Sequence, residues 1–184
     1  MKFNSLNIAG AYTIELVPFE DNRGNFARTF CKKTFESIVP GGIEFVQINH
    51  SVTHKEGVIR GMHYQIQPYT EDKLIRCING VVYDVLIDLR KNSPTFLHWE
   101  SIELSKVNRK MIFIPKGCAH GFQTLSEDAE LIYHHSAFYT PEGDRGIRYN
   151  DPTINIKWPL VPTTVSEKDR NHPFINEKFT GIEI

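Results

Sequence analysis

The sequence has few cysteines and no long apolar run, and both absences limit what the protein can be. Its cysteines are widely spaced and form no CxxC pair, namely Cys31, Cys77 and Cys118. An odd count of this kind argues against a disulfide framework and against a structural zinc site, and suits a reducing compartment. Residues 1–5 do not begin a signal peptide, and no apolar run approaches transmembrane length. We therefore expect a cytoplasmic protein that does not enter a membrane.

A strong net charge is also missing. The 21 Lys and Arg against 22 Asp and Glu give a formal net charge of −1. No overall field therefore attracts nucleic acid or an anionic membrane, and an anionic ligand would need a local cluster of Arg and Lys. The 184 residues are enough for one hydrophobic core, and nothing in the sequence requires a second. We expect a single domain over residues 1–184.

Short strand-like stretches are what the sequence contains instead. They follow one another at a spacing of roughly ten residues with little helix between them, which indicates an all-β sandwich or barrel. A turn is expected at residues 21–25, and a short helix at 32–39 that stops at residues 40–42. After residue 140, recurring prolines interrupt any long element. The expected strands lie within residues 3–17, 26–31, 43–53, 58–65, 73–79, 81–89, 99–104, 111–115, 119–125 and 130–139.

The residues best suited to chemistry lie between positions 57 and 80. Strand alternation over 58–65 predicts Arg60 and Met62 on one face, and His63 and Gln65 on the other. Lys73 begins the next strand on the same face as the apolar residues 75 and 77. A basic side chain that points into a sheet interior must be paired, or it lines a ligand pocket. We expect the chemistry here.

Two neighbouring strands add polar groups whose role the pattern leaves open. Gln47, Asn49 and Ser51 share one face of the expected strand 43–53, which faces either solvent or a polar pocket. In the strand 81–89 the odd positions are all apolar and predict a core face. The even face carries Asp84 and Asp88, and Asp84 is as well suited to supporting another residue as to catalysis.

Two segments resemble the two motifs of the cupins. Residues 57–80 have the glycine, histidine and glycine spacing of the first motif, and residues 115–120 read Pro-x-Gly-x-x-His, as in the second. Lys73 stands where metal-binding cupins have a glutamate, and its ammonium repels a divalent cation and cannot coordinate it while protonated. The frame therefore predicts a cupin-like barrel whose metal is replaced by organic acid–base groups. The four positions that hold the metal in metal-binding cupins read here His63, Gln65, Lys73 and His120.

A longer series of motifs spans nearly the whole chain. In order they are Arg23-Gly24-x-Phe26, Gln47-x-Asn49-x-Ser51, Arg60-Gly61-Met62-His63, Lys73, Asp84, Ser93-Pro94-Thr95, Ile114-Pro115-x-Gly117-x-Ala119-His120-Gly121, Tyr133, Tyr139-x-Pro141, Asn150-Asp151-Pro152, Trp158-Pro159-Leu160 and Ser166-Glu167-Lys168-Asp169. Together they resemble the dTDP-4-dehydrorhamnose 3,5-epimerases of deoxysugar, rhamnose and polysaccharide biosynthesis. The resemblance implies a cupin-like jelly roll with short helices and a Pro-rich C-terminal segment. It also implies a homodimer with strand exchange, and an isomerase that needs no metal or organic cofactor.

The implied reaction inverts C3, C5 or both, on either side of the C4 ketone of a nucleotide-linked 4-keto-6-deoxyhexose. It needs a base on one face of the sugar, an acid on the other, and positive charge near the ketone oxygen. His63 suits the base, and the resemblance pairs it with Asp169, which would fix the imidazole tautomer. Tyr133 fits the acid and Lys73 fits the stabiliser of the enolate. His120 either helps to hold that oxygen, supports Lys73, or is structural.

Other residues are candidates for holding the nucleotide sugar. Arg60 suits the diphosphate, which needs cationic donors. Arg23 and Lys168 suit it too, but Arg23 could instead form a surface ion pair, and Lys168 could instead be solvated. Arg28 stands where the family usually has a glutamate close to the nucleoside, so the base is open between dTDP, CDP and GDP sugars. The implied substrate-binding residues are Arg23, Arg60 and Lys168 for phosphate, Gln47 and Asn49 for phosphate or sugar hydroxyls, Phe26 and Arg28 for the nucleoside, and Tyr139 for the sugar.

Two other functions are compatible with parts of this pattern. A sugar-nucleotide 3,4-ketoisomerase on the same fold also works through an enolate, but Lys73, Tyr133 and Asp169 together argue against it. A sugar-nucleotide binding cupin without turnover would share the pocket and lack proton exchange. A metal dioxygenase is disfavoured by Gln65 and Lys73. The sequence does not decide the base, the sugar, or how many carbons are inverted.

Overall fold

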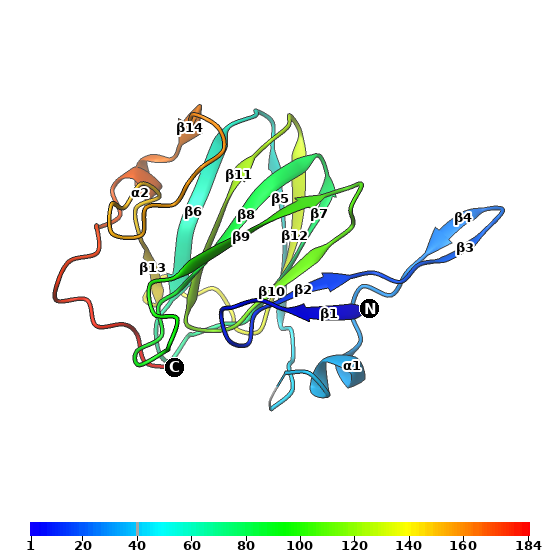
Figure 1. Cartoon of the computed structure of the whole chain (residues 1–184), viewed down its shortest axis with the longest axis horizontal. Coiled ribbons are helices and arrows are strands. Elements are labelled where there is room, and N and C mark those ends of the chain that lie inside the picture. Colours follow the sequence, from blue (N-terminus) through cyan, green and yellow to red (C-terminus); the bar gives the residue numbers. More distant parts are fainter. Residues whose placement is uncertain (40) are drawn as a thin grey trace.

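The computed structural model describes residues 1–39 and 41–184. Two main sheets face each other and curl into a barrel, as Figure 1 shows. The first has the order β1 (Lys2–Ser5), β2 (Tyr12–Glu15), β10 (Met111–Ile114), β7 (Lys73–Asn79), β12 (Ala129–His135) and β5 (Gln47–Thr53). The second has the order β13 (Asp144–Gly146), β6 (Val58–Gln65), β11 (Cys118–Thr124), β8 (Val81–Asp88) and β9 (Trp99–Ser105), and β14 (Thr164–Val165) runs parallel to β6. The prediction of an all-β barrel is confirmed.

The interior between the sheets is apolar toward one end and polar toward the other. On β7, Ile75 and Cys77 lie in the main apolar cluster, while Lys73 at the start of the strand lines a cavity. The neighbouring β12 runs the opposite way in a register that pairs His135 with Lys73 and Leu131 with Cys77. Because side chains on one strand face recur at every second residue, the polar positions of both strands meet at the same end.

Both sheets are also covered on their outer faces, which explains why a chain of this size buries so many apolar side chains. Phe35 of the short helix α1 (Lys32–Glu36) packs with Leu74 and Phe113 on the outside of the first sheet. On the second sheet, Met62 and Ile87 pack against residues 147–156 of the Pro-rich C-terminal part. Each such side chain contributes about 1.5–3 kcal/mol when fully buried, so these layers fix the strands that carry the cavity.

A β-bulge in β6 overturns one prediction from strand alternation. Arg60 and His63 both line the cavity, whereas Met62 lies in the cluster on the outer face. The pairing with β11 shifts here, since His120 lies opposite His63 but Phe122 lies opposite Arg60. The extra residue lets two side chains of opposite parity face the same way. The expectation that Arg60 and His63 lie on opposite faces is therefore wrong.

Glycine is required at this bulge by close contact between the backbones of β6 and β11. A Cβ on Gly61 would lie 2.5 Å from the Cα of Gly121, and the φ of Gly61 is +132°. Only glycine adopts such a backbone readily and leaves room for the neighbouring strand. Gly61 of the sequence motif thus permits the bulge, and the close approach of Gly121 requires a glycine at that position.

Several element boundaries also differ from the sequence expectations. Residues 27–31 are irregular, because the strand expected over 26–31 ends with β4 (Gly24–Phe26). The helix α1 ends at Glu36, earlier than expected, and position 40 of its expected stop lies outside the described residues. The sequence reading missed α2 (Glu167–Arg170), whose four residues are too few to show helical periodicity. Its one sequence signal is Ser166, whose Oγ accepts a hydrogen bond from the backbone N–H of Asp169.

The hairpin of β3 (Phe19–Asp21) and β4 stands away from the barrel, at the far right of Figure 1. Its turn contains Gly24 with φ of +128°, in the place where the turn at 21–25 was expected. Phe19 and Phe26 are 71% and 78% exposed. Helices are short throughout the described residues, and none has the length and apolar character needed to cross a bilayer.

Candidate active site

A cavity of about 570 Å³ opens at the polar end of the barrel, between the two sheets. Side chains reach it from β5, β7 and β12 of one sheet and from β6 and β11 of the other. Most of the candidate site residues proposed from the sequence converge here. Those that line it are Asn49, Arg60, His63, Lys73, His120, Tyr133, Tyr139, Lys168 and Asp169.

His63 and Asp169 form a hydrogen-bonded pair on one wall. The Nε2–H of His63 donates to Oδ1 of Asp169 at 2.7 Å, while the backbone N–H of Gly61 donates to Oδ2 at 3.2 Å. The Asp169 side chain is 5% exposed and that of His63 is 38% exposed. Burial raises the pKa of Asp169, but the hydrogen bond and charge of His63, with Gly61 and Ser166, lower it more. The ionised carboxylate thus fixes the His63 tautomer and leaves Nδ1 available to the cavity.

His172 is a third member of this group that the sequence reading missed. Its Nε2 lies 3.6 Å from Oδ1 of Asp169, and its ring meets that of His63 edge-on with centroids 5.7 Å apart. Burial is the main cause of the lowered pKa of His172. Among the described residues, His63, Asp169 and His172 are the one group of three or more such side chains close enough to hold a metal ion. The metal positions of the cupin frame do not form one.

Tyr133 projects into the cavity from β12, in the sheet opposite to that of His63. Its ring stacks on His135 at an interplanar angle of 16° and meets His120 edge-on at 71°. Ser51 Oγ donates to the phenol oxygen at 3.4 Å. Burial raises the pKa of Tyr133, so the phenol keeps its proton at neutral pH and is suited to act as an acid.

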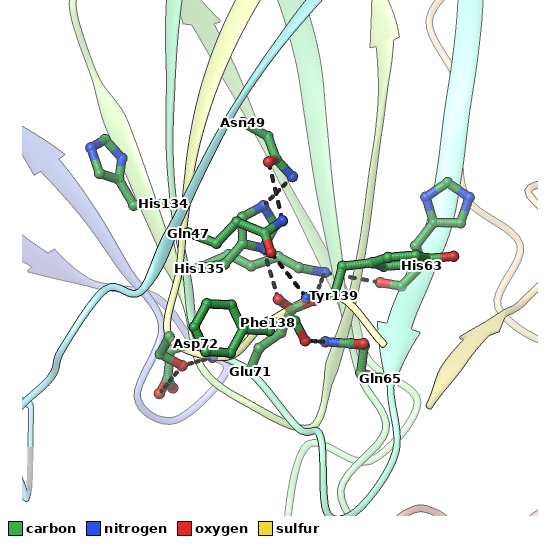
Figure 2. Close-up of polar contacts among 12 residues, drawn as sticks. Gln47, Asn49, His63, Gln65, Glu71, Asp72, His134, His135, Phe138 and Tyr139 are labelled. Atoms are coloured by element: carbon green, nitrogen blue, oxygen red, sulfur yellow. Dashed lines mark hydrogen bonds and ion pairs between the residues drawn. The ribbon is translucent and has the colours of Figure 1, made fainter. Parts of the chain in front are cut away.

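Lys73 is held by a buried carboxylate that was not predicted. Its Nζ lies 3.2 Å from Oε1 of Glu71 and donates to the backbone oxygen of His63 at 3.4 Å. The other oxygen of Glu71 accepts from Nδ1–H of His135 at 2.7 Å, as Figure 2 shows. Burial raises the pKa of Glu71, but Lys73 and His135 lower it more, so it stays ionised. One carboxylate therefore fixes both the ammonium and the imidazole on which Tyr133 stacks.

A chain of hydrogen bonds continues from His135 to the loop that carries Tyr139 (Figure 2). Asn49 donates to Nε2 of His135 at 3.3 Å and accepts from Gln47 at 3.1 Å. The Gln47 oxygen then accepts from the backbone N–H of Tyr139 at 3.1 Å. Tyr139 lies beyond the end of β12, so it does not continue the strand face of Tyr133 as expected. Tyr139 reaches the cavity from a loop that these hydrogen bonds hold in place.

His120 lies deeper, against a carboxylate with no exposed surface. Its Nε2–H donates to Oδ2 of Asp84 at 2.9 Å. The second oxygen of Asp84 has no hydrogen-bond partner among the described residues. Burial lowers the pKa of His120 and raises that of Asp84. The pair supports the cavity behind Lys73 and Tyr133, which favours a supporting role for Asp84 over direct catalysis.

Cationic side chains stand near the mouth of the cavity. Arg60 donates to Oγ1 of Thr53 at 3.0 Å and to the oxygen of Val52 at 3.2 Å, and remains exposed. Lys168 pairs with Asp144, which also accepts from the hydroxyl of Tyr139 at 3.2 Å. Both cations keep donors that an anionic ligand can use.

Four predicted substrate residues do not line this cavity: Gln47, which reaches it only through the hydrogen bonds to Asn49 and Tyr139, and three residues on or beside the β3–β4 hairpin. Arg23 is on the β3–β4 hairpin, where its side chain is 84% exposed and pairs with Asp21 at 2.5 Å. Phe26 ends the same hairpin, and Arg28 is exposed just after it. The chain does not bring these last three residues to its own site, so their contact with substrate stays a prediction that needs a second chain.

The site residues that sequence reasoning missed were Glu71, His135, Asp144 and His172. Glu71 lies in the irregular segment between β6 and β7, where alternation gives no direction. His135 had a usable signal, because it stands two residues after Tyr133 on the same strand face. His172 had only its closeness in sequence to Asp169.

Comparison with known proteins gives a consistent result. The family model described as dTDP-4-dehydrorhamnose 3,5-epimerase matches residues 5–177. A Shigella flexneri dTDP-4-dehydrorhamnose 3,5-epimerase is 48% identical over 153 residues, which cover 83% of this chain and 84% of that protein.

Two solved structures extend the likeness to the fold. The Bacillus anthracis dTDP-4-dehydrorhamnose 3,5-epimerase, solved with TDP and pyrophosphate bound, superposes with a TM-score of 0.90 at 38% identity over 95% of this chain and 99% of that one. A Legionella pneumophila epimerase in complex with dTDP-4-keto-L-rhamnose gives a TM-score of 0.91 at 36% identity over 100% and 98%. The cupin-like jelly roll expected from the sequence is thereby confirmed.

Proposed function

The chain belongs to the dTDP-4-dehydrorhamnose 3,5-epimerase family, and we propose how its own residues perform the reaction. It is an isomerase that epimerises C3 and C5 of a nucleotide-linked 4-keto-6-deoxyhexose. The observation that carries the proposal is the arrangement of the cavity. The His63–Asp169 pair stands on one sheet, and Tyr133 and Lys73 face it from the other.

The first step is removal of a proton next to the C4 ketone. Nδ1 of His63 takes the proton, and the C–H electron pair moves into an enolate. Asp169 stabilises the imidazolium that forms, because its carboxylate already accepts the Nε2–H at 2.7 Å. The ammonium of Lys73 stabilises the negative oxygen, and Glu71 holds that ammonium in place.

The second step returns a proton to the opposite face of the carbon. Tyr133 suits this step because it comes from the opposite sheet and keeps its phenolic proton. Its phenolate regains a proton from solvent, and the imidazolium of His63 gives one up, so the net change is one inverted centre. The same sequence repeated at the other carbon gives the second inversion.

The nucleotide is held by the cations at the cavity mouth. Arg60 and Lys168 are proposed to bind the diphosphate, while Gln47 and Asn49 orient the sugar through the hydrogen-bond chain that ends at Tyr139. The Bacillus anthracis relative was solved with TDP bound, which supports a dTDP sugar as the substrate here. Arg28 is the residue that tests this assignment, because a donor replaces the acidic group expected near the nucleoside.

We propose a homodimer in which the β3–β4 hairpin reaches the partner. The exposed Phe19 and Phe26 stand on a hairpin that projects from the barrel (Figure 1), and exposed apolar side chains of this kind mark interaction sites. Arg23, Phe26 and Arg28 would then complete the neighbouring cavity. Sedimentation should give a mass near twice 21.2 kDa. A fully active monomer would refute the shared site.

The reaction is tested by proton NMR of dTDP-, CDP- and GDP-linked 4-keto-6-deoxyhexoses in D2O. The expected result is loss of the H3 and H5 signals of the dTDP sugar, together with signals of the inverted product. A 3,4-ketoisomerase would instead move the ketone, and a binding protein would leave both signals intact. Activity should survive exhaustive chelation, since none of the proposed steps uses a metal. Activity that is lost on chelation and restored by added metal would overturn this mechanism.

A further inference from the structure

Beside His63, in the wall of the cavity, three side chains bring potential ligand atoms close together. His63, Asp169 and His172 each offer one such atom, and all three lie within 4.8 Å of one another. Two of the separations are short, at 2.7 Å from His63 and 3.6 Å from His172 to the same oxygen of Asp169. His63 donates a hydrogen bond to this oxygen, whereas Nε2 of His172 lies beyond hydrogen-bond distance of it.

The ring of His172 is held in place without a hydrogen bond at Nε2. That nitrogen is buried and has no hydrogen-bond partner among the described residues. A buried imidazole nitrogen in this state costs free energy unless something binds it. It points toward the carboxylate of Asp169 at a distance too long for a hydrogen bond, yet short enough for both groups to share an ion.

The neighbouring strand leaves room for this arrangement. Gly146 of β13 pairs with His63 of β6, and a Cβ at that position would lie 2.2 Å from Nε2 of His172. The missing side chain therefore creates the space in which the His172 ring sits beside the His63 ring. Any other residue at position 146 would push His172 away.

Two imidazoles and one carboxylate are a ligand set that Zn²⁺ accepts, with the fourth tetrahedral position open. The cupin metal positions carry Gln65 and Lys73 in place of ligands, so this group is a different ligand set that shares His63 with them. We propose that the chain binds one Zn²⁺ through His63, Asp169 and His172, and that this ion inhibits the enzyme. The inference about inhibition rests on the proposed role of His63 as the base.

Inhibition follows from where the imidazole proton must go. Zn²⁺ takes the place of the proton between Nε2 of His63 and Asp169, and that proton moves to Nδ1, so the imidazole stays neutral and no redox change occurs. A neutral imidazole with its metal on Nε2 carries its proton on Nδ1. Nδ1 is the nitrogen that would accept the substrate proton, so the zinc-bound enzyme has no base.

The test compares the purified full chain with a His172→Ala variant. Zinc binding is measured by equilibrium dialysis against ZnCl₂, and inhibition by deuterium exchange into the 4-keto sugar nucleotide. We expect the unmodified chain to bind one zinc ion and to lose exchange as it binds. His172→Ala should bind zinc about 10–100-fold more weakly, and its exchange, measured relative to its own zinc-free rate, should be inhibited only at correspondingly higher zinc concentrations. His172→Asn, which keeps a polar side chain of similar reach, serves if the alanine variant folds poorly.

Matched variants separate this site from general zinc binding. His54→Ala removes the histidine of an exposed His–Asp pair, with Asp128 at 2.9 Å, and should change neither affinity nor inhibition. Gly146→Ala should weaken zinc binding because its methyl group displaces the His172 ring. A chain that epimerises but takes up no zinc would overturn the zinc site and leave the proposed function intact. A His172→Ala variant that zinc inhibits as strongly as the unmodified chain would do the same. A chain that binds zinc but exchanges no substrate proton would overturn the proposed function instead.

Discussion

Two buried aspartates stand four residues apart on β8, and their surroundings differ sharply. Neither Asp84 nor Asp88 has exposed surface. Asp88 accepts hydrogen bonds from Arg90, Ser93 and Thr95, at 2.6 to 2.8 Å from their side chains. These bonds outweigh the effect of burial and lower the pKa of Asp88 to about 2. Among the residues that the structure describes, Asp84 has one hydrogen-bond partner, His120, and burial raises the pKa of Asp84.

The difference separates the scaffold from the site. At Asp88 the chain satisfies a buried charge completely, so removing that charge should cost stability and leave chemistry intact. At Asp84 a buried carboxylate is left half satisfied beside Lys73 and the cavity. Buried polar groups with too few hydrogen bonds reduce the free energy of unfolding, and they are tolerated where substrate binding or proton transfer needs them. Changes near the cavity should therefore alter rates more than stability.

The largest effect is expected for His63→Ala. If His63 is the base, every C–H cleavage passes through it, so both deuterium exchange and product formation should fall by about 10²–10⁴-fold. NMR in D2O measures both quantities, and the melting temperature should change little because the side chain is partly exposed. A variant that still exchanges at the unmodified rate would remove His63 from the mechanism.

Tyr133→Phe should affect only one of these two rates. The ring and its stacking on His135 remain, and the hydroxyl is lost. Deprotonation by His63 can still occur, and the enolate can be reprotonated on the face it came from. We expect exchange to persist while formation of the inverted sugar falls about 100-fold. Equal loss of exchange, or inversion at the normal rate, would contradict the assignment of Tyr133 as the acid.

Much of the candidate catalytic set could be proposed before the structure, because ordered motifs carried it. His63, Lys73, His120, Tyr133 and Asp169 do meet in one cavity. Strand alternation alone predicted that Lys73 shares a face with the apolar residues that follow it on β7, which is confirmed. This works because period two is a property of regular strand backbone.

The failures come from places where that regularity ends. Arg60 was assigned to the wrong face because the bulge at Gly61 is a tertiary contact with Gly121, which local pattern does not contain. Glu71 was missed because it lies in an irregular segment, where the direction of a side chain depends on distant partners such as His135. The Phe26 hairpin shows the same limit, since it stands away from its own barrel and the contacts proposed for it lie in a second chain.

Asp88→Asn tests the scaffold side of the comparison. The lowered pKa of Asp88 corresponds to about 2 kcal/mol of stability at neutral pH. The amide of asparagine has a single oxygen, so it cannot accept from Nε–H and Nη2–H of Arg90 with two separate oxygens, as Asp88 does. We expect the free energy of unfolding to fall by at least about this amount with turnover unchanged. Chemical denaturation and the NMR assay measure the two effects.

The same substitution has a defined pH dependence. A carboxylate with a depressed folded pKa contributes its full stability above its unfolded pKa, and loses it as pH falls through the folded value. For Asp88 that window runs from pH 3.8 down to about 2. The stability difference between the unmodified chain and Asp88→Asn should therefore be constant near neutrality and shrink inside this window. A difference that grows on acidification would contradict the assignment.

Glu71→Gln should have a smaller effect, confined to the cavity. Glutamine keeps one acceptor for Lys73, but its amide nitrogen cannot accept from Nδ1–H of His135. Weakening this charge-assisted pair should lower kcat about tenfold with KM nearly unchanged, because the ammonium acts mainly on the enolate. Restoration of kcat by Glu71→Asp is not expected to be complete, since the shorter chain reaches both partners less well. A change in KM alone would argue for a substrate-binding role instead.

The smallest effect, and the most informative sign, is expected for Asp84→Asn. Burial raises the pKa of Asp84, so its charged form is disfavoured in the folded chain, and the stability linked to its protonated form is lost as pH rises through the folded pKa. Asparagine resembles the protonated carboxyl and still accepts from Nε2–H of His120. The free energy of unfolding at neutral pH should be unchanged or higher, by less than about 1 kcal/mol, which is opposite in sign to Asp88→Asn. Turnover should fall a few-fold, since the amide holds the imidazole of His120 behind Lys73 less strongly than the carboxyl group of Asp84 does. Denaturation of both variants side by side measures this contrast, and a loss of stability at position 84 as large as that at 88 would show that the two buried carboxylates belong to the same scaffold.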